Sequence, residues 1–148
     1  MALWLIFLLY AVIGALAATG AIALTSRRLA PRAEQVAYGI LLVPIAAFYL
    51  AFEAQLGPGA GAGSELLPVL AFAALGLAGM RVAPLLALGY LGHGIWDLLH
   101  EILMHQERLG SFTAIPLAYG VFCAVFDCMI AGYAWTRRAA WAAGWRAP

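Results

Sequence analysis

The sequence predicts an all-α integral membrane bundle of five transmembrane helices, and three observations support this fold class. First, 66% of the 148 residues are apolar, only 10% are charged and the mean hydropathy is +0.94. Soluble domains, in contrast, are about half apolar and about a quarter charged. Second, the apolar residues fall into runs long enough to cross a membrane. Third, seven of the eight arginines lie on one side when the chain is drawn as five antiparallel spans.

The same composition excludes several classes of protein. A soluble domain of this size has too much surface to hide so many apolar side chains from water. The formal net charge is only +1, lysine is absent, and no basic stretch is long enough to follow the phosphates of a nucleic acid. We therefore exclude a soluble enzyme, a disordered chain, a coiled coil and a nucleic-acid-binding protein.

The first apolar run predicts a helix over residues 2–24, which exceeds the roughly 20 residues needed to cross a hydrocarbon core. A cleaved signal peptide is the alternative, because Ala-Leu-Ala at residues 15–17 fits a cleavage site. We favour a retained helix, since no basic residue precedes the run and the apolar stretch continues to the arginines at 27–28.

The rest of the chain predicts four more helices within one transmembrane domain, residues 1–148. The glycine-rich stretch 57–64 has little side-chain surface to pack and predicts a loop. The apolar stretch 65–104 is too long for one span, and Arg81 followed by Pro84 divides it, because proline is tolerated in the first turn of a helix. These helices are expected at residues 36–56, 66–80, 83–104 and 112–135.

Arginine placement predicts the orientation of a multi-pass protein of the cell membrane. Cytoplasmic loops carry the excess of positive charge. One side of the five-helix arrangement receives Arg27, Arg28, Arg32, Arg81, Arg137, Arg138 and Arg146, and the other receives only Arg108. The N-terminus is therefore expected outside and the C-terminus in the cytoplasm.

Six ionisable side chains lie within the predicted helices, where each costs about 2.5–3.5 kcal/mol at mid-helix. They are Glu53, His93, Asp97, His100, Glu101 and Asp127. Such groups must pair with one another, hold a cation or face water. Because they occur on three helices at matching depths, we expect the second, fourth and fifth helices to surround one polar cavity that opens outward.

Three of these side chains form a stripe along the fourth helix. At about 100° per residue, His93, Asp97 and His100 occupy one side of that helix. Two imidazoles and a carboxylate suit zinc or non-haem iron, so these three residues are the expected metal ligands. The remaining carboxylates are candidates to complete the ligand set or to act as the general base. These candidate catalytic residues are Glu53, Glu101 and Asp127.

The spacing of His93 and Asp97 resembles motifs of several membrane enzymes. It is similar to the HxxxH pair of seven-helix zinc-binding hydrolases and to the HxxxE pair of sterol isomerases, which move protons without metal. Histidine-box hydroxylases are also similar, although they use more histidines than the three in this chain. The stretch HGIWDLLH at residues 93–100 resembles a small uncharacterised bacterial family of multi-pass membrane proteins with an HGxWDxxH stretch, which implies no known activity.

Two functions follow from these residues. The first is a metal-dependent membrane enzyme, whose cofactor would be a divalent transition metal such as zinc or iron and whose partners would be membrane lipid and an apolar or lipid-like small molecule. The alternative is a proton-coupled transporter or ligand-binding membrane protein that uses the same residues without metal, because histidine titrates near neutral pH. A transporter built from so short a chain would require a homo-oligomer. A purely structural subunit would leave the polar residues unexplained.

Overall fold

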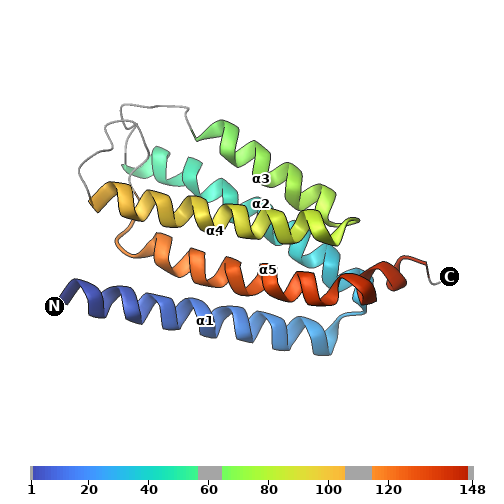
Figure 1. Cartoon of the computed structure of the whole chain (residues 1–148). Coiled ribbons are helices and arrows are strands. Elements are labelled where there is room, and N and C mark those ends of the chain that lie inside the picture. The colour runs from blue at the N-terminus through green and yellow to red at the C-terminus, as the bar shows by residue number, and fades with distance from the viewer. Residues whose placement is uncertain (1, 57–64, 106–114, 147–148) are drawn as a thin grey trace.

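The computed structural model describes residues 2–56, 65–105 and 115–146, and these form a bundle of five helices. The described residues contain no β-strand. Each helix runs antiparallel to the one before it (Figure 1). The helices are α1 (Ala2–Arg28), α2 (Pro31–Leu56), α3 (Leu66–Gly79), α4 (Ala83–His105) and α5 (Tyr119–Gly144).

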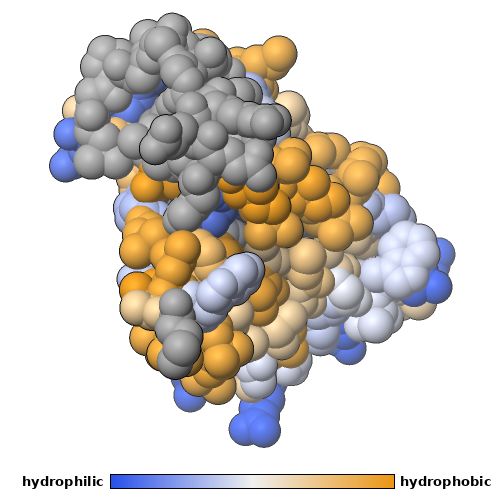
Figure 2. Space-filling model, turned by 60° about the vertical axis from the view of Figure 1, so that its left-hand side comes forward, coloured by the Kyte–Doolittle hydropathy of each residue, from blue (hydrophilic) through white to orange (hydrophobic). Residues whose placement is uncertain are grey.

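Three of the helices, Ala2–Arg28, Pro31–Gln55 and Tyr119–Gly144, are long and apolar enough to cross a membrane. The helix Leu66–Gly79 is also apolar but shorter. Hydrophobic side chains cover the middle of the face shown in Figure 2, whereas strongly hydrophilic groups lie mostly at its margins. A lateral surface of this kind suits contact with lipid rather than water.

α3 ends at Gly79 and α4 begins at Ala83, so the boundary between them lies at Arg81 and Pro84, as the sequence predicted. This boundary could be predicted because an arginine and a proline act on the helix locally. α5 differs more from the expected range: it begins at Tyr119 and extends to Gly144, well beyond the expected end at 135. Residues 112–114 of that range, like the expected loop at 57–64, lie outside the described residues. The extension of α5 brings Trp141 into the core, where its side chain is fully buried.

α5 is central to the packing, since it contacts α1, α2 and α4. Two glycines bring α4 and α5 close together. A Cβ added to Gly120 of α5 would overlap the backbone oxygen of Asp97, and one added to Gly94 of α4 would lie 3.0 Å from the Cβ of Asp127. The absence of side chains at these two positions therefore sets the distance between the polar residues of the two helices.

Arginines gather at one end of the bundle. The α1–α2 turn, the α3–α4 turn and the end of α5 all lie at this end (Figure 1). The guanidinium groups of Arg32 and Arg81 each lie 4.1 Å from the ring centroid of Trp145, which joins the three segments through cation–π contacts. Arg108, which was expected at the opposite end, lies outside the described residues.

Candidate functional site

A buried group of one imidazole and two carboxylates lies where α4 meets α5. Nδ1 of His93 is 2.7 Å from Oδ2 of Asp127 and 3.0 Å from Oδ2 of Asp97. The three side chains are at most 1% exposed. Each offers one ligand atom within 4.8 Å of the others, and the group therefore has the composition and size of a metal-binding site.

Local helical geometry and close packing assemble this group, which we call the His–Asp–Asp group. His93 and Asp97 are four residues apart on α4, so their side chains lie on the same face one turn apart. Asp127 approaches from α5, and Gly94 permits the close approach of the two helices. The sequence correctly predicted that Asp127 would lie within about 8 Å of an imidazole.

The group has more acceptors than protons to satisfy them. Nδ1 of His93 carries at most one proton, and it is hydrogen bonded to Asp127. Oδ1 of Asp127 and Nε2 of His93 are buried without a hydrogen-bond partner in the part of the chain that the structure describes, and Oδ2 of Asp97 has the 3.0 Å contact with Nδ1 of His93. A buried unsatisfied polar atom costs about 1–3 kcal/mol. The two unsatisfied atoms leave hydrogen-bonding capacity that an additional proton, water, cation or ligand could fill.

Tyr49 of α2 orients one carboxylate of the group. Its hydroxyl donates a hydrogen bond of 2.5 Å to Oδ1 of Asp97, and the side chain is 1% exposed. This bond leaves the other oxygen of Asp97 directed toward His93. The sequence signal for Tyr49 was weak, because a tyrosine in an apolar helix is more often a packing residue.

His100 lies apart from the His–Asp–Asp group, although the sequence placed it in the same ligand set as His93 and Asp97. Its Nε2 is 3.1 Å from Oε1 of Glu65, and its Nδ1 is 3.2 Å from the backbone oxygen of Trp96. The ring of Tyr49 packs against the His100 imidazole, with centroids 4.8 Å apart. His100 therefore connects the end of α4 to the start of α3.

The other two candidate catalytic carboxylates also lie outside the group. Glu101 accepts hydrogen bonds of 3.0 Å from the backbone N–H groups of Ala118 and Gly120. It thereby satisfies free donors at the start of α5, where Ala118 has a positive φ of 62°. Glu53 lies one turn beyond Tyr49 on α2 and is half-buried. Its expected proximity to an imidazole stays a prediction.

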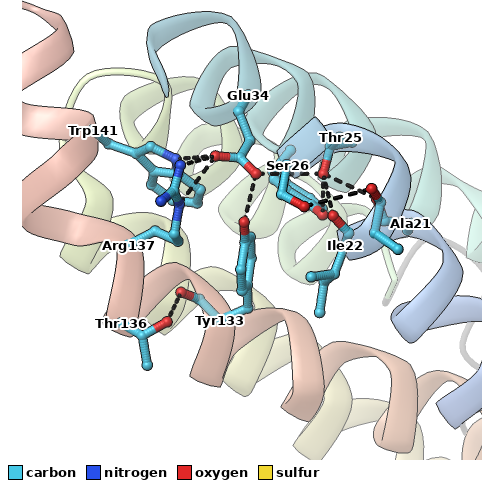
Figure 3. Close-up of polar contacts among 11 residues, drawn as sticks. Ala21, Ile22, Thr25, Ser26, Glu34, Tyr133, Thr136, Arg137 and Trp141 are labelled. Atoms are coloured by element: carbon cyan, nitrogen blue, oxygen red, sulfur yellow. Dashed lines mark hydrogen bonds and ion pairs between the residues drawn. The ribbon is translucent and has the colours of Figure 1, made fainter. Parts of the chain in front are cut away.

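The structure contains a second buried polar cluster, centred on Glu34 (Figure 3). The carboxylate accepts hydrogen bonds from the hydroxyl of Tyr133 at 2.6 Å, the guanidinium of Arg137 at 3.0 Å and the indole N–H of Trp141 at 2.7 Å. Both oxygens of Glu34 are thus occupied, in contrast to the His–Asp–Asp group. We conclude that this cluster joins α2 to α5 structurally.

The Glu34 cluster was missed because Glu34 lies near the end of an apolar run, where a charged residue needs no special explanation. A signal was nevertheless present in the sequence. Tyr133, Arg137 and Trp141 recur every four residues and therefore share one face of a helix. That repeated polar face indicates a buried acceptor on a neighbouring helix.

The fold and the site define an all-α helical bundle with a buried His–Asp–Asp group between its fourth and fifth helices. The chain belongs to a family of unknown function, DUF6010, whose model matches residues 9–140. No curated protein and no solved structure matches the chain significantly. The matched residues include the whole His–Asp–Asp group. A family of unknown function is consistent with the resemblance of this chain to an uncharacterised family.

Proposed function

We propose that this protein is a multi-pass membrane enzyme that uses a divalent transition metal, zinc or iron, to act on an apolar or lipid-like substrate. His93, Asp97 and Asp127 would hold the metal. The observation that carries the proposal is the convergence of three buried ligand atoms from these residues with too few protons among them. The assignment places Asp127 among the ligands rather than as a separate base.

Three properties support the membrane location. Three helices have the length and composition of membrane spans, and the helices alternate in direction. The arginines of the described residues gather at one end of the bundle, which we assign to the cytoplasm by the positive-inside rule. The N-terminus then lies outside and the C-terminus inside the cell membrane.

The chemistry of the three side chains suits the proposed metal. Imidazole and carboxylate are ligands of both zinc and non-haem iron, and three protein ligands leave a position open for water or substrate. Ligands at about 2.0–2.1 Å from a tetrahedral ion are roughly 3.3 Å apart. The distances of 2.7 Å and 3.0 Å from Nδ1 of His93 would therefore increase by about 0.6 Å and about 0.3 Å on metal binding.

One observation favours the alternative, a proton-coupled transporter or ligand-binding protein. The short direct contact between His93 and Asp127 is the geometry of a hydrogen bond, and a shared proton satisfies it without metal. A bundle of this size would serve as a transporter in a homo-oligomer.

Elemental analysis distinguishes the two functions. The protein is purified in mild detergent without added metal, together with His93→Gln, Asp127→Asn and the control His100→Gln. We expect about one zinc or iron per chain in the wild type and in the control, and loss of metal in the other two variants. A metal-free wild type that also fails to bind added zinc or iron would overturn the metal proposal and favour proton chemistry. Equal metal in all four proteins would show that the ion binds elsewhere.

A further inference from the structure

Two arginines share one tryptophan ring at the end of the bundle that carries the α1–α2 and α3–α4 turns (Figure 1). The guanidinium carbons of Arg32 and Arg81 each lie 4.1 Å from the ring centroid of Trp145. Both arginines are exposed. A guanidinium group carries five N–H donors in its plane, and contact with an aromatic face leaves these donors available to a ligand. We call these three residues the Arg–Trp platform.

Buried polar contacts hold the ring of this platform in place. The indole N–H of Trp145 donates a hydrogen bond of 3.0 Å to Oε1 of Gln35, whose Nε2 donates one of 2.8 Å to the backbone oxygen of Gly79. Gln35 is 1% exposed. A Cβ added to Gly144 would lie 3.1 Å from the backbone N of Arg32, so the end of α5 packs closely on the start of α2. Contacts with α2 and α3 therefore fix the indole, which in turn orders two arginine side chains that are flexible in water.

The charge of the platform is not neutralised by the described residues. Glu34, the described acidic residue at this end, is fully buried and forms its ion pair with Arg137. Neither Arg32 nor Arg81 forms an ion pair with a carboxylate within residues 2–56, 65–105 and 115–146. Both also lie at the N-terminal ends of helices, α2 and α4, where the helix dipole favours an anion rather than a cation. Two ordered positive charges at these positions indicate a site for an anion.

Exposed apolar side chains next to the platform indicate that this anion belongs to a lipid. Leu77, one turn before Arg81 in the chain, is 56% exposed, and Val82, the residue after Arg81, is 46% exposed. A free phosphate ion gains nothing from apolar surface beside its site. A phospholipid, in contrast, places its phosphate at the level of the helix ends and its acyl chains along the apolar side of the bundle.

We propose that the Arg–Trp platform binds the phosphate of an anionic phospholipid in the cytoplasmic leaflet. The guanidinium groups of Arg32 and Arg81 donate hydrogen bonds to the phosphate oxygens, which the planar guanidinium fork matches in pairs. A zwitterionic lipid is bound less well, because the platform repels the positive charge of its headgroup. The inference rests on the membrane location and orientation in the proposed function and is independent of the metal site.

Native mass spectrometry of the detergent-purified protein tests the proposal by counting bound lipids. The protein is incubated with an equimolar mixture of phosphatidylglycerol and phosphatidylcholine that have the same acyl chains. We expect at least about tenfold more phosphatidylglycerol than phosphatidylcholine on the wild type, and no change in this ratio with millimolar inorganic phosphate. Equal binding of the two lipids would overturn the proposal. Displacement of phosphatidylglycerol by inorganic phosphate would also overturn it, because the site would then be one for a free anion.

Matched double variants separate the platform from the general positive charge at this end. Arg32→Gln/Arg81→Gln should lower the ratio of bound phosphatidylglycerol to phosphatidylcholine at least about fivefold. The control Arg27→Gln/Arg28→Gln removes two exposed arginines of α1 at the same end and should change the ratio less than about twofold. Trp145→Leu keeps every charge but removes the ring, and it should also lower the ratio.

An equal loss in the two double variants, or a wild-type ratio in Trp145→Leu, would overturn the platform as the binding site. The wild-type comparison of the two lipids decides the proposal whatever the stability of the variants. Since no metal takes part in lipid binding, failure here is distinguishable from a negative elemental analysis.

Discussion

At the scale of single residues, Tyr49 has the clearest supporting role. Its hydroxyl contacts Asp97 from a different helix and fixes which carboxylate oxygen is directed toward His93. Residues that orient a metal ligand in this way contribute substantially to affinity, because a freely rotating carboxylate must be ordered when the ion binds.

Removal of this hydroxyl should weaken the proposed metal site without unfolding the protein. We expect Tyr49→Phe to lower zinc or iron affinity about 10–100-fold, the usual effect of losing such a supporting hydrogen bond. The measurement is competition with a chelator of known affinity. Tyr10→Phe is the control, since Tyr10 lies on α1 and is 37% exposed. Unchanged affinity in Tyr49→Phe would contradict the assigned role.

Glu34 is expected to contribute to stability rather than to function. Glu34→Gln removes the charge that pairs with Arg137 and weakens the bonds donated by Tyr133 and Trp141. We expect a loss of about 2–3 kcal/mol in the free energy of unfolding, below the figure for a fully buried pair because Arg137 is 32% exposed.

Reversible unfolding in mixed micelles measures this loss, with Arg138→Gln as the control at an exposed arginine on the same helix. A destabilisation no larger than that of the control would show that the Glu34 cluster is dispensable. Metal content should be unchanged in both variants, since the cluster is separate from the His–Asp–Asp group.

At the scale of helices, the contact between α4 and α5 determines whether the site forms. Gly120→Ala would place a methyl group against the backbone oxygen of Asp97, which cannot move away as a flexible side chain would. We expect a destabilisation of about 1–3 kcal/mol and reduced metal content, because the two helices must separate.

Gly132→Ala is a matched control for this variant. It lies on the same helix with no atom within 4 Å of the added Cβ. Alanine is a better helix former than glycine by about 0.5–1 kcal/mol, so this variant should be neutral or slightly stabilised. Both are compared by unfolding and by elemental analysis. Equal behaviour of the two variants would show that close packing at Gly120 is unimportant.

Helix number and the α3–α4 boundary could be predicted because their signals are local: apolar runs, Arg81 and Pro84. The start of α5 could not be predicted in this way. It depends on Glu101 of α4, which accepts hydrogen bonds from the backbone N–H groups of Ala118 and Gly120. Its end likewise depends on Trp141 reaching Glu34. Contacts between distant segments overrode the local pattern in both places.

The polar residues of the site were predictable because ionisable groups in apolar helices are costly. Which of these residues lie together in the structure could be predicted only in part. Helical periodicity correctly placed His93 and Asp97 on one face, and depth matching brought in Asp127. The same periodicity could not show that His100 would turn to Glu65, because that choice depends on where α3 begins and on the intervening ring of Tyr49.

At the scale of the whole molecule, the orientation in the membrane can be tested directly. In a background with both native cysteines replaced by serine, an impermeant maleimide is applied to intact cells. We expect it to label Ala2→Cys and to spare Ser26→Cys, since the arginine-rich end should lie in the cytoplasm. Ser64→Cys, outside the described residues, should also be labelled. The reverse pattern would invert the orientation, and labelling of both Ala2→Cys and Ser26→Cys would contradict a membrane span in α1.

The packing of α1 has a consequence for motion. Its buried residues are Gly14 and Ala18, so the segment before Gly14 has no buried residue of its own. At its other end, Thr25 is hydrogen bonded to Tyr38 of α2 at 2.8 Å. The first three turns of α1 should therefore swing about the Gly14 contact while the opposite end stays fixed. Backbone amides before Gly14 should exchange with deuterium faster than those of α5, where eight residues are buried along the helix.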